Sequence, residues 1–270
     1  MPWKAELEFM KVQARAAGAI MRRFYKGDFR VFTKPDRSKV TEVDLKISEM
    51  LQKTVPEAFP GVILYSEESE TGPIDRNRDH FVIDELDGTS YFIEEHQGFS
   101  HQAAFYKAGK GLVVGLVYYP IDDILLYAMR GHGAFLEHQG EVKALAARQQ
   151  SKPSHSLRFA QPARYRGDKY RQLLGSIGVD SDRIVKTTAR RTLQFVQGEL
   201  DVALFLMRRI PEWDWAGEKV VLEELGFSHT YLDGRPIEFG KEPASDNPGY
   251  LICHPDHRPR LMQQALAWLD

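Results

Sequence analysis

One short acidic segment, Asp84-Glu85-Leu86-Asp87-Gly88-Thr89, limits what this chain can fold into. It follows the apolar run Phe81-Val82-Ile83, which is typical of a short buried strand. The strand therefore ends in two carboxylates, Asp84 and Asp87, and no Lys or Arg lies within the segment to neutralise them. Because burying an unpaired charge is costly, these carboxylates need a counter-charge. A divalent cation meets that need, and oxygen-only ligands favour Mg²⁺, Mn²⁺ or Ca²⁺ over zinc.

The end of the same segment indicates an anion. Gly88 lets the backbone turn tightly and approach a ligand, and Thr89 can begin a helix whose free N–H groups attract negative charge. A cation and an anion held by one turn predict metal-assisted phosphate chemistry.

The composition disfavours several other classes of protein. A chain of 270 residues has room for one large domain or two intimate lobes. A formal net charge of −2 gives no support for binding a nucleic acid polymer through overall charge. We expect no membrane span, because no stretch approaches about eighteen consecutive apolar residues. The charged residues Lys4, Glu6, Glu8 and Lys11 interrupt any signal region, and the single Cys253 fits a reducing compartment, so we expect a cytoplasmic protein.

Helices and strands alternate along the chain. Apolar residues recur at helical spacing from Trp3 to Phe24, which predicts a long first helix. A second helix is expected to begin at Thr41, because Thr41 and Asp44 have the spacing of a capping box, and to be ended by Pro56 and then Pro60-Gly61. Further strands are expected at residues 61–65, 81–83, 99–106, 111–119, 124–129, 157–160 and 202–206, and further helices at 170–177, 192–197 and 213–225.

The stretch from Glu141 to Pro153 is polar and rich in alanine, which favours a boundary between lobes. We therefore predict an N-terminal α+β lobe of residues 1–148, with most of the candidate metal ligands, and a C-terminal α/β lobe of residues 149–270, with Asp214. Strands interspersed with helices indicate a layered α/β or α+β architecture, although the pattern alone leaves the topology open.

Four acidic positions, Glu67, Asp84, Asp87 and Asp214, each stand at the edge of a predicted element. Carboxylates at the ends of rigid elements can converge from distant parts of a chain. Two divalent ions about 3.5–4 Å apart can clamp the attacking and leaving oxygens of a phosphoryl transfer. Asp84 is the natural bridge between two such ions, and the Leu86 carbonyl can supply a further oxygen.

Several of these residues also have a structural interpretation. Asp214 can cap a helix, and Asp44 can act only within its capping box. Glu67 and Glu68 can be solvated turn residues. A turn explains Asp87-Gly88, but it does not explain Asp84 at the end of an apolar strand, where function is favoured.

Four segments in order resemble the signatures of the inositol monophosphatase-like superfamily of Mg-dependent phosphatases. They are Val40-Thr41-Glu42-Val43-Asp44, Ser66-Glu67-Glu68, Asp84-Glu85-Leu86-Asp87-Gly88-Thr89 and Trp213-Asp214-Trp215-Ala216-Gly217. Within the superfamily the chain is most similar to the bacterial 3′(2′),5′-bisphosphate nucleotidase branch, through residues 86–93, 98–100 and 113–120. The resemblance implies a layered αβαβα sandwich of the sugar-phosphatase type, shared by inositol monophosphatase and fructose bisphosphatase.

The resemblance also implies a set of metal ligands. Glu67, Asp84 and the Leu86 carbonyl would hold a first Mg²⁺, and Asp84, Asp87 and Asp214 a second. Glu67 could also reach a third, weaker ion. Two or three Mg²⁺ ions are therefore expected, together with inhibition by Li⁺.

The same resemblance implies catalytic and substrate-binding roles. Thr89 and Asp44, with Glu67, would orient and help deprotonate a metal-bound water for in-line attack on phosphorus. The Gly88 and Thr89 amides would cradle the phosphate, and Asp214 would also contact the substrate.

The chain departs from the superfamily patterns at three places. Glu85 stands where the motif has proline, and its side chain is expected to point outward. Residues 187–191, Thr-Thr-Ala-Arg-Arg, replace the pattern G-S-x-x-[KR]. Thr188 and Arg191 remain candidate substrate contacts there, Arg191 for a second phosphate, although a solvated helix face explains the arginines equally well. Residues 204–209, Leu-Phe-Leu-Met-Arg-Arg, replace the nucleotidase-type Y-P-R segment.

The leading hypothesis is an Mg²⁺-dependent phosphomonoesterase for a small phosphorylated metabolite. A bisphosphorylated nucleotide such as 3′-phosphoadenosine 5′-phosphate is the first candidate, and an inositol or sugar monophosphate the second. A hypothesis of another class is a catalytically weak protein that binds phosphorylated ligands. We expect a monomer or a homodimer, with neither a nucleic acid polymer nor a membrane as partner.

Overall fold

The computed structural model describes residues 2–69, 72–148, 152–162, 168–207, 209–241 and 248–269. Its largest element is a seven-stranded sheet in the order β3-β4-β5-β6-β7-β8-β9. β3 and β4 are parallel, and every later pair is antiparallel. The strands are β3 (Ile63–Ser66), β4 (His80–Asp87), β5 (Ser100–Lys107), β6 (Gly111–Tyr119), β7 (Ile124–Met129), β8 (Ala134–His138) and β9 (Glu141–Leu145).

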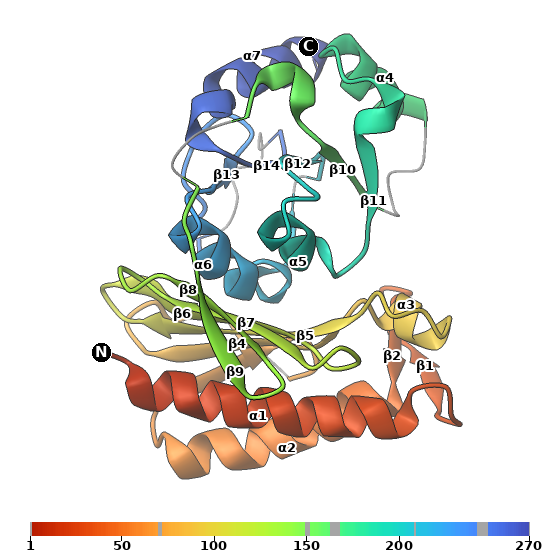
Figure 1. Cartoon of the computed structure of the whole chain (residues 1–270). Coiled ribbons are helices and arrows are strands. Elements are labelled where there is room, and N and C mark those ends of the chain that lie inside the picture. The colour runs from red at the N-terminus through yellow and green to blue at the C-terminus, as the bar shows by residue number, and fades with distance from the viewer. Residues whose placement is uncertain are drawn as a thin grey trace.

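Helices cover both faces of this sheet (Figure 1). On one face lie α1 (Lys4–Phe24) and α2 (Glu42–Ala58); on the other lie α5 (Arg191–Val196) and α6 (Ala216–Glu224). A hairpin of β1 (Val31–Thr33) and β2 (Lys39–Thr41) stands beside the short helix α3 (Thr89–Ile93) at one end of the sheet.

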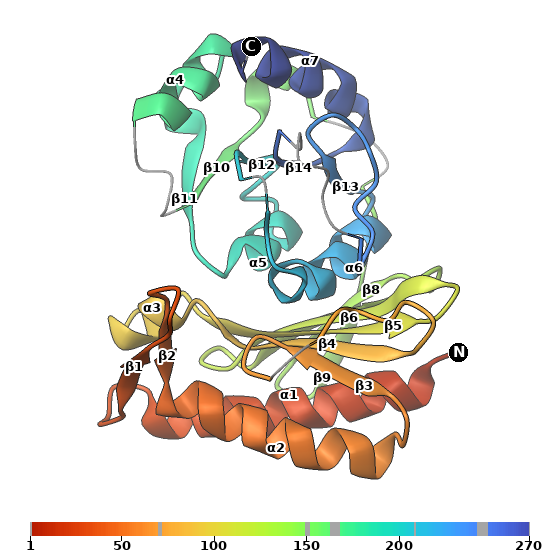
Figure 2. The same cartoon turned by 180° about the vertical axis from the view of Figure 1, so that it is seen from behind.

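A smaller set of strands lies beyond α5 and α6 (Figure 2). β12 (Ala203–Phe205), β14 (Tyr250–Cys253) and β13 (Ser228–Tyr231) form an antiparallel sheet, and β10 (Phe159–Pro162) pairs in parallel with β11 (Ile184–Thr187). Helices α4 (Asp168–Ser176) and α7 (Arg258–Leu269) cover its outer side. The layers therefore follow the order αβαβα, which confirms the predicted fold class.

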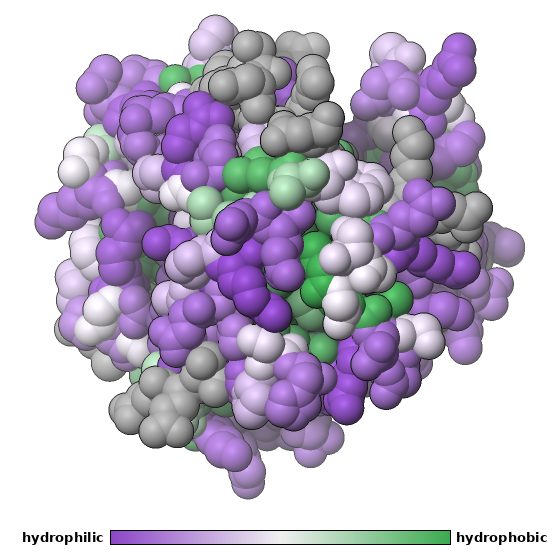
Figure 3. Space-filling view, turned by 90° about the horizontal axis from the view of Figure 1, so that it is seen from above, coloured by the Kyte–Doolittle hydropathy of each residue, from purple (hydrophilic) through white to green (hydrophobic). Residues whose placement is uncertain are grey.

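A hydrophobic core fills each gap between layers. Alternate residues of β4 face opposite ways, so Phe81 and Ile83 join the core beneath α1 and α2, and Val82 joins the core beneath α6. A third cluster, which includes Leu173 and Leu251, lies between the small strands and the outer helices. Seen from the side of α4 and α7, the surface is mostly hydrophilic, and apolar groups show in a central area (Figure 3).

Local sequence explains how α2 begins and, in part, how it ends. The Thr41 hydroxyl accepts hydrogen bonds from the Val43 and Asp44 amides, and the Asp44 carboxylate accepts one from the Thr41 amide, so the predicted capping box is present. The prediction that Pro60 and Gly61 end the helix is confirmed: α2 ends at Ala58, and Phe59, the residue before Pro60, has left the helical backbone angles. The prediction is wrong for Pro56, which lies inside the last turn.

The polar stretch at 141–153 contains a strand that sequence patterning missed. β9 is almost wholly exposed, and its pairing with β8 comes from backbone hydrogen bonds rather than from an apolar face. Residues 149–151 lie outside the described residues, and a division into lobes at 148/149 stays a prediction. Among the described helices, none is both long enough and apolar enough to cross a membrane.

Candidate active site

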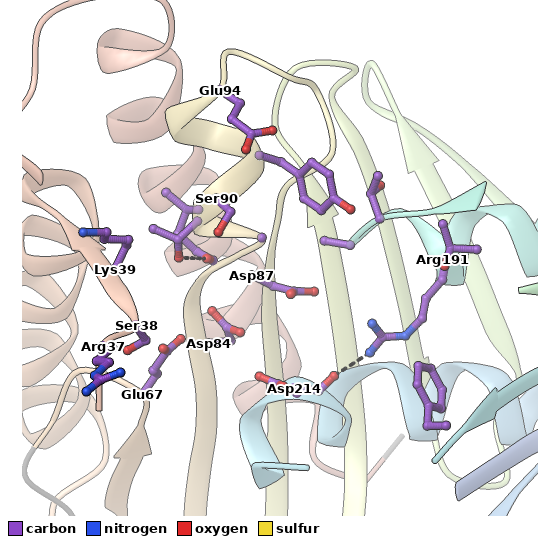
Figure 4. A pocket seen from close by; sticks show the side chains of 18 residues that line it. Arg37, Ser38, Lys39, Glu67, Asp84, Asp87, Ser90, Glu94, Arg191 and Asp214 are labelled. Atoms are coloured by element: carbon purple, nitrogen blue, oxygen red, sulfur yellow. Dashed lines mark hydrogen bonds between the residues drawn. The ribbon is translucent and has the colours of Figure 1, made fainter. Parts of the chain in front are cut away.

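A cavity of about 670 Å³ opens at the end of the large sheet where β4 runs into α3 (Figure 4). It gathers nine of the ten residues predicted for the site. They are Glu67, Asp84, Leu86, Asp87, Gly88, Thr89, Thr188, Arg191 and Asp214. The tenth, Asp44, is buried directly behind the cavity, with its Oδ1 atom 3.5 Å from the Thr89 hydroxyl.

The end of β4 is irregular, and this irregularity shapes the site. The register between β4 and β5 shifts between Asp84 and Asp87. In this break the Leu86 carbonyl accepts a hydrogen bond of 3.1 Å from the Thr89 hydroxyl. Gly88 then turns the chain with φ 86°, and a Cβ atom there would lie 2.8 Å from the Gly98 carbonyl oxygen. Only glycine meets both conditions without strain.

Asp84 lies at the centre of the carboxylates. It is buried, and its Oδ1 atom has no hydrogen-bond partner among the described residues. Burial raises the pKa of Asp84 well above its usual value, and the charges of Glu67, Asp87 and Asp214 raise it further. A bound cation would offset both the burial and the repulsion.

Glu67 and Glu68 are not solvated turn residues. Their side chains are 23% and 7% exposed, and Lys34 Nζ lies 3.0 Å from Glu67 Oε1 and 2.5 Å from Glu68 Oε1. Burial lowers the pKa of Lys34, but the hydrogen bond to Glu68 and the charge of Glu67 outweigh it, so the pKa is raised. Sequence reasoning missed Lys34, although it lies just before the signature that begins at Val40.

Neighbouring side chains hold Asp87 in place, and Asp214 lies at the end of a short turn. Asp87 accepts hydrogen bonds from Gln102 Nε2 and, at 3.4 Å, from the Ser100 hydroxyl, both on β5. Asp214 ends a 3₁₀ turn, and the N-cap of α6 is Trp215. Asp214 is therefore not the helix cap that one alternative proposed.

Asp44 combines its structural role with a position next to the cavity. Burial raises its pKa to about 6, and hydrogen bonds from Thr41 oppose that rise. The structural interpretation of Asp44 is confirmed, and a catalytic role beside Thr89 stays a prediction.

Arg191 is not part of a solvated helix face. Its Nε and Nη2 atoms donate to Glu218 Oε1 at 3.0 and 2.8 Å, and Nη2 also donates to the Asp214 carbonyl oxygen at 2.8 Å. Its guanidinium also stands over the Phe205 ring. Glu218, which sequence reasoning missed, follows the Trp213-Asp214 signature by one helical turn. Thr188 lines the cavity and accepts a hydrogen bond from the Arg190 amide.

The profile of the inositol monophosphatase family matches residues 3–267 of this chain. The chain belongs to this family. A similar curated relative is the 3′(2′),5′-bisphosphate nucleotidase CysQ of Aggregatibacter actinomycetemcomitans, 28% identical over 242 residues that cover 88% of this chain and 89% of the relative. The inositol-1-monophosphatase of Bacillus subtilis is 24% identical over 241 residues, which cover 88% and 89% of the two chains.

Solved structures show the same fold. The extragenic suppressor protein suhB of Bartonella henselae aligns with a TM-score of 0.78 at 22% identity, covering 97% of this chain and 98% of its own. SaIMPase-II with bound 2′AMP aligns with a TM-score of 0.75 at 20% identity, covering 98% and 97%. Because the family and the curated relatives are phosphatases, this protein is a metal-dependent phosphoric monoester hydrolase.

The donor set of this family member fits Mg²⁺. Every candidate ligand is an oxygen atom, which is what Mg²⁺ prefers. Among the described residues, no three His, Cys, Asp or Glu side chains are already gathered into a closed metal site.

Glu85, which replaces the proline of the family motif, does not lie where it was predicted. The expectation that Glu85 points outward is wrong, because its side chain is fully buried on the opposite face of β4 from Asp84. Its Oε1 atom accepts a hydrogen bond of 2.7 Å from the Ser66 hydroxyl. Burial raises the pKa of Glu85 to about 7, and the Ser66 hydrogen bond opposes that rise.

Proposed function

We propose that this protein is an Mg²⁺-dependent phosphomonoesterase that favours a 3′(2′),5′-bisphosphate nucleotide such as 3′-phosphoadenosine 5′-phosphate. The observation that carries the proposal is the convergence of Glu67, Asp84, Asp87 and Asp214 on one cavity beside Thr89. Four carboxylates from three separate segments are unfavourable together unless a cation joins them.

The proposed ligand sets are those that the family resemblance implies, and their residues line one cavity. Glu67, Asp84 and the Leu86 carbonyl would hold one Mg²⁺, and Asp84, Asp87 and Asp214 would hold another. Bound Mg²⁺ would lower the pKa of water and neutralise charge that develops on the phosphate. One family neighbour, staphylococcal inositol monophosphatase-1, forms an inhibitory complex with LiCl, which supports the proposal that Li⁺ inhibits this enzyme too.

The protein's own groups would orient the substrate and move the proton. The Thr89 hydroxyl donates to the Leu86 carbonyl and lies 3.5 Å from Asp44 Oδ1. With a pKa of about 6, Asp44 is ionised near neutral pH and can accept the Thr89 Oγ1 proton as Thr89 takes one from the attacking water. The Gly88 and Thr89 amides would hold phosphate oxygens at the same turn.

The proposed preference for a bisphosphate rests on positively charged side chains at the mouth of the cavity. Arg191 lines the cavity but already donates to Glu218 and Asp214. Arg37 and Lys39, exposed on the β1–β2 hairpin, line the same cavity and add positive charge for a second phosphate. The similarity to two CysQ nucleotidases, at 28% and 26% identity, supports this substrate class.

An inositol monophosphate is the second candidate substrate. SaIMPase-II, a structural neighbour, has been solved with inositol monophosphate and with 2′AMP, so one fold of this kind accepts both kinds of ligand. In this chain the apolar side chain of Phe205 lines the cavity near Arg191. The polar ring of an inositol phosphate would gain little binding energy from contact with it.

Phosphate release from nucleotide, inositol and sugar phosphates, measured as Mg²⁺ is titrated, tests the proposal. We expect turnover to require Mg²⁺ and to be fastest with the bisphosphate. Asp84→Asn should lower turnover by at least about 100-fold, because the bridging ligand is lost. Glu137→Gln, a buried carboxylate on β8 far from the cavity, is the matched control.

A double variant at the cavity mouth tests the substrate class. Arg37→Ala with Lys39→Ala should raise KM for the bisphosphate by about 10-fold and leave KM for a nucleoside monophosphate nearly unchanged. Equal effects on both substrates would refute the second-phosphate contact. Tight binding of phosphorylated ligands without turnover of any would favour the non-catalytic alternative instead.

A further inference from the structure

Glu85 occupies a position that an acidic residue should avoid. It lies on the same face of β4 as Phe81 and Ile83, which pack in the apolar core beneath α1 and α2. Its side chain is fully buried, and its Oε2 atom has no hydrogen-bond partner among the described residues. A carboxyl group placed there is unfavourable unless its contacts compensate.

The contacts of the Glu85 side chain reach two other segments of the site. Glu85 Oε1 accepts the Ser66 hydroxyl at 2.7 Å, and Ser66 is the residue directly before Glu67. The Ser66 amide and hydroxyl are in turn 3.1 and 3.0 Å from the Ser69 hydroxyl, which closes the turn after β3. On the other side, the Ser48 hydroxyl also stabilises the ionised Glu85 carboxyl. Ser48 lies one turn of α2 beyond Asp44.

The Glu85 backbone is also held from β5. His101 Nδ1 lies 3.1 Å from the Glu85 carbonyl oxygen. This contact falls in the region where the regular pairing of β4 with β5 is interrupted, between Asp84 and Asp87. The His101 side chain thus takes the place of a backbone hydrogen bond between β4 and β5. It does so next to Leu86, whose carbonyl faces the cavity.

We propose that Glu85 is a positioning residue for the metal site, which links β3 to β4 so that Glu67 and Asp84 keep a fixed relative placement. In the family motif a proline, which restricts φ, stands here. In this chain the hydrogen bonds that Glu85 accepts restrain the segment, as the ring of proline does elsewhere. The inference rests on the proposed metal site, because it concerns the geometry of that site's ligands.

A merely structural role and a positioning role predict different results for Mg²⁺ binding. Groups that orient metal ligands change metal affinity by about 10- to 100-fold when they are removed. Titration calorimetry with Mg²⁺ as the only added ligand measures this directly, without turnover. Thermal unfolding in EDTA measures the loss of stability separately.

Three variants and one control separate the possibilities. Glu85→Ala and Ser66→Ala should each weaken Mg²⁺ binding by about 10-fold or more. Glu85→Gln keeps an oxygen that can accept the Ser66 hydroxyl, so its Mg²⁺ affinity should stay within about threefold of wild type. Glu137→Ala removes a carboxylate that binds Lys11 and Arg15 at β8, which β5, β6 and β7 separate from β4, and it should destabilise the fold without changing Mg²⁺ affinity.

The outcomes are distinguishable. Mg²⁺ affinity within twofold of wild type in Ser66→Ala, a variant with a small change in volume, would overturn the inference even where Glu85→Ala does not fold. Equal weakening in Glu85→Gln and Glu85→Ala would assign the effect to charge and also overturn it. A wild-type protein that binds no Mg²⁺ would instead refute the proposed function.

Discussion

Arg191 and Glu218 form a buried ion pair at the wall of the cavity, with two guanidinium nitrogens 3.0 and 2.8 Å from one carboxylate oxygen. Burial raises the pKa of Glu218, and the charge of Arg191 opposes that rise. The same guanidinium donates to the Asp214 carbonyl, so the pair connects α5, α6 and a proposed metal ligand. The pair therefore shapes the site as well as the core.

Glu218→Ala should be strongly destabilising. Removing one partner of a buried pair leaves the other charge uncompensated, at a cost of about 3–5 kcal/mol in the free energy of unfolding. Urea unfolding measures this. Asp233→Asn breaks the more exposed pair with Arg235 and should have a far smaller effect. Similar losses in both variants would contradict the importance of burial.

Asp84→Asn should stabilise the protein without metal while it abolishes catalysis. Asp84 has a raised pKa, so its charge is unfavourable in the metal-free fold at pH 8, and the neutral amide removes that cost. We expect a higher Tm than wild type in EDTA. Added Mg²⁺ should raise the Tm of wild type and leave the variant nearly unchanged. A lower Tm for the variant in EDTA would show that the Asp84 charge does not destabilise the metal-free fold.

Gly88→Ala should lower both stability and activity. The left-handed φ and the contact with the Gly98 carbonyl each oppose a Cβ atom, so we expect a loss of roughly 1–3 kcal/mol. Gly175, near the end of α4, has open space around the position of a Cβ atom. Gly175→Ala should therefore leave activity unchanged and be neutral or stabilising by up to about 1 kcal/mol. Thermal unfolding and phosphate release compare the two variants.

Sequence alone predicts the features of this protein that depend on local chemistry. The capping box at Thr41, the buried strand that leads into Asp84 and the turn at Gly88 follow from residue types a few positions apart. The coming together of Glu67 and Asp214 was inferable only through the family resemblance, because nothing local joins segments so far apart.

The features that sequence reasoning missed depend on tertiary contacts. In the sequence Glu218 looks like an ordinary polar residue of a helix. Only the structure shows that it accepts hydrogen bonds from Arg191. From the sequence Glu85 was expected to point into solvent. The alternation of residues along β4 does not reveal that the Ser66 hydroxyl lies against its carboxylate. β9 was missed because an exposed edge strand carries no apolar pattern. For Glu218 and Glu85 the residue that explains the position is distant in sequence, and for β9 the apolar pattern of a strand is absent.

His101 should make the protein sensitive to acid. It is fully buried on β5, and burial lowers its pKa from 6.5 to about 4, although the hydrogen bond with the Glu85 carbonyl opposes that shift. In the unfolded chain a histidine binds a proton as the pH falls through about 6.5. Between these two pKa values the unfolded state binds more protons, so the free energy of unfolding falls as the pH falls.

The variant His101→Asn isolates this contribution. Its amide nitrogen can replace Nδ1 as the donor to the Glu85 carbonyl, and it does not titrate. Urea unfolding of metal-free protein between pH 7 and pH 4 should show wild type losing roughly 3 kcal/mol more than the variant. The buried acids Asp44 and Glu85 and the buried His229 titrate in both proteins, so their contributions cancel in the comparison. Parallel pH profiles for the two proteins would mean that His101 gains its proton in the folded state as readily as in the unfolded chain.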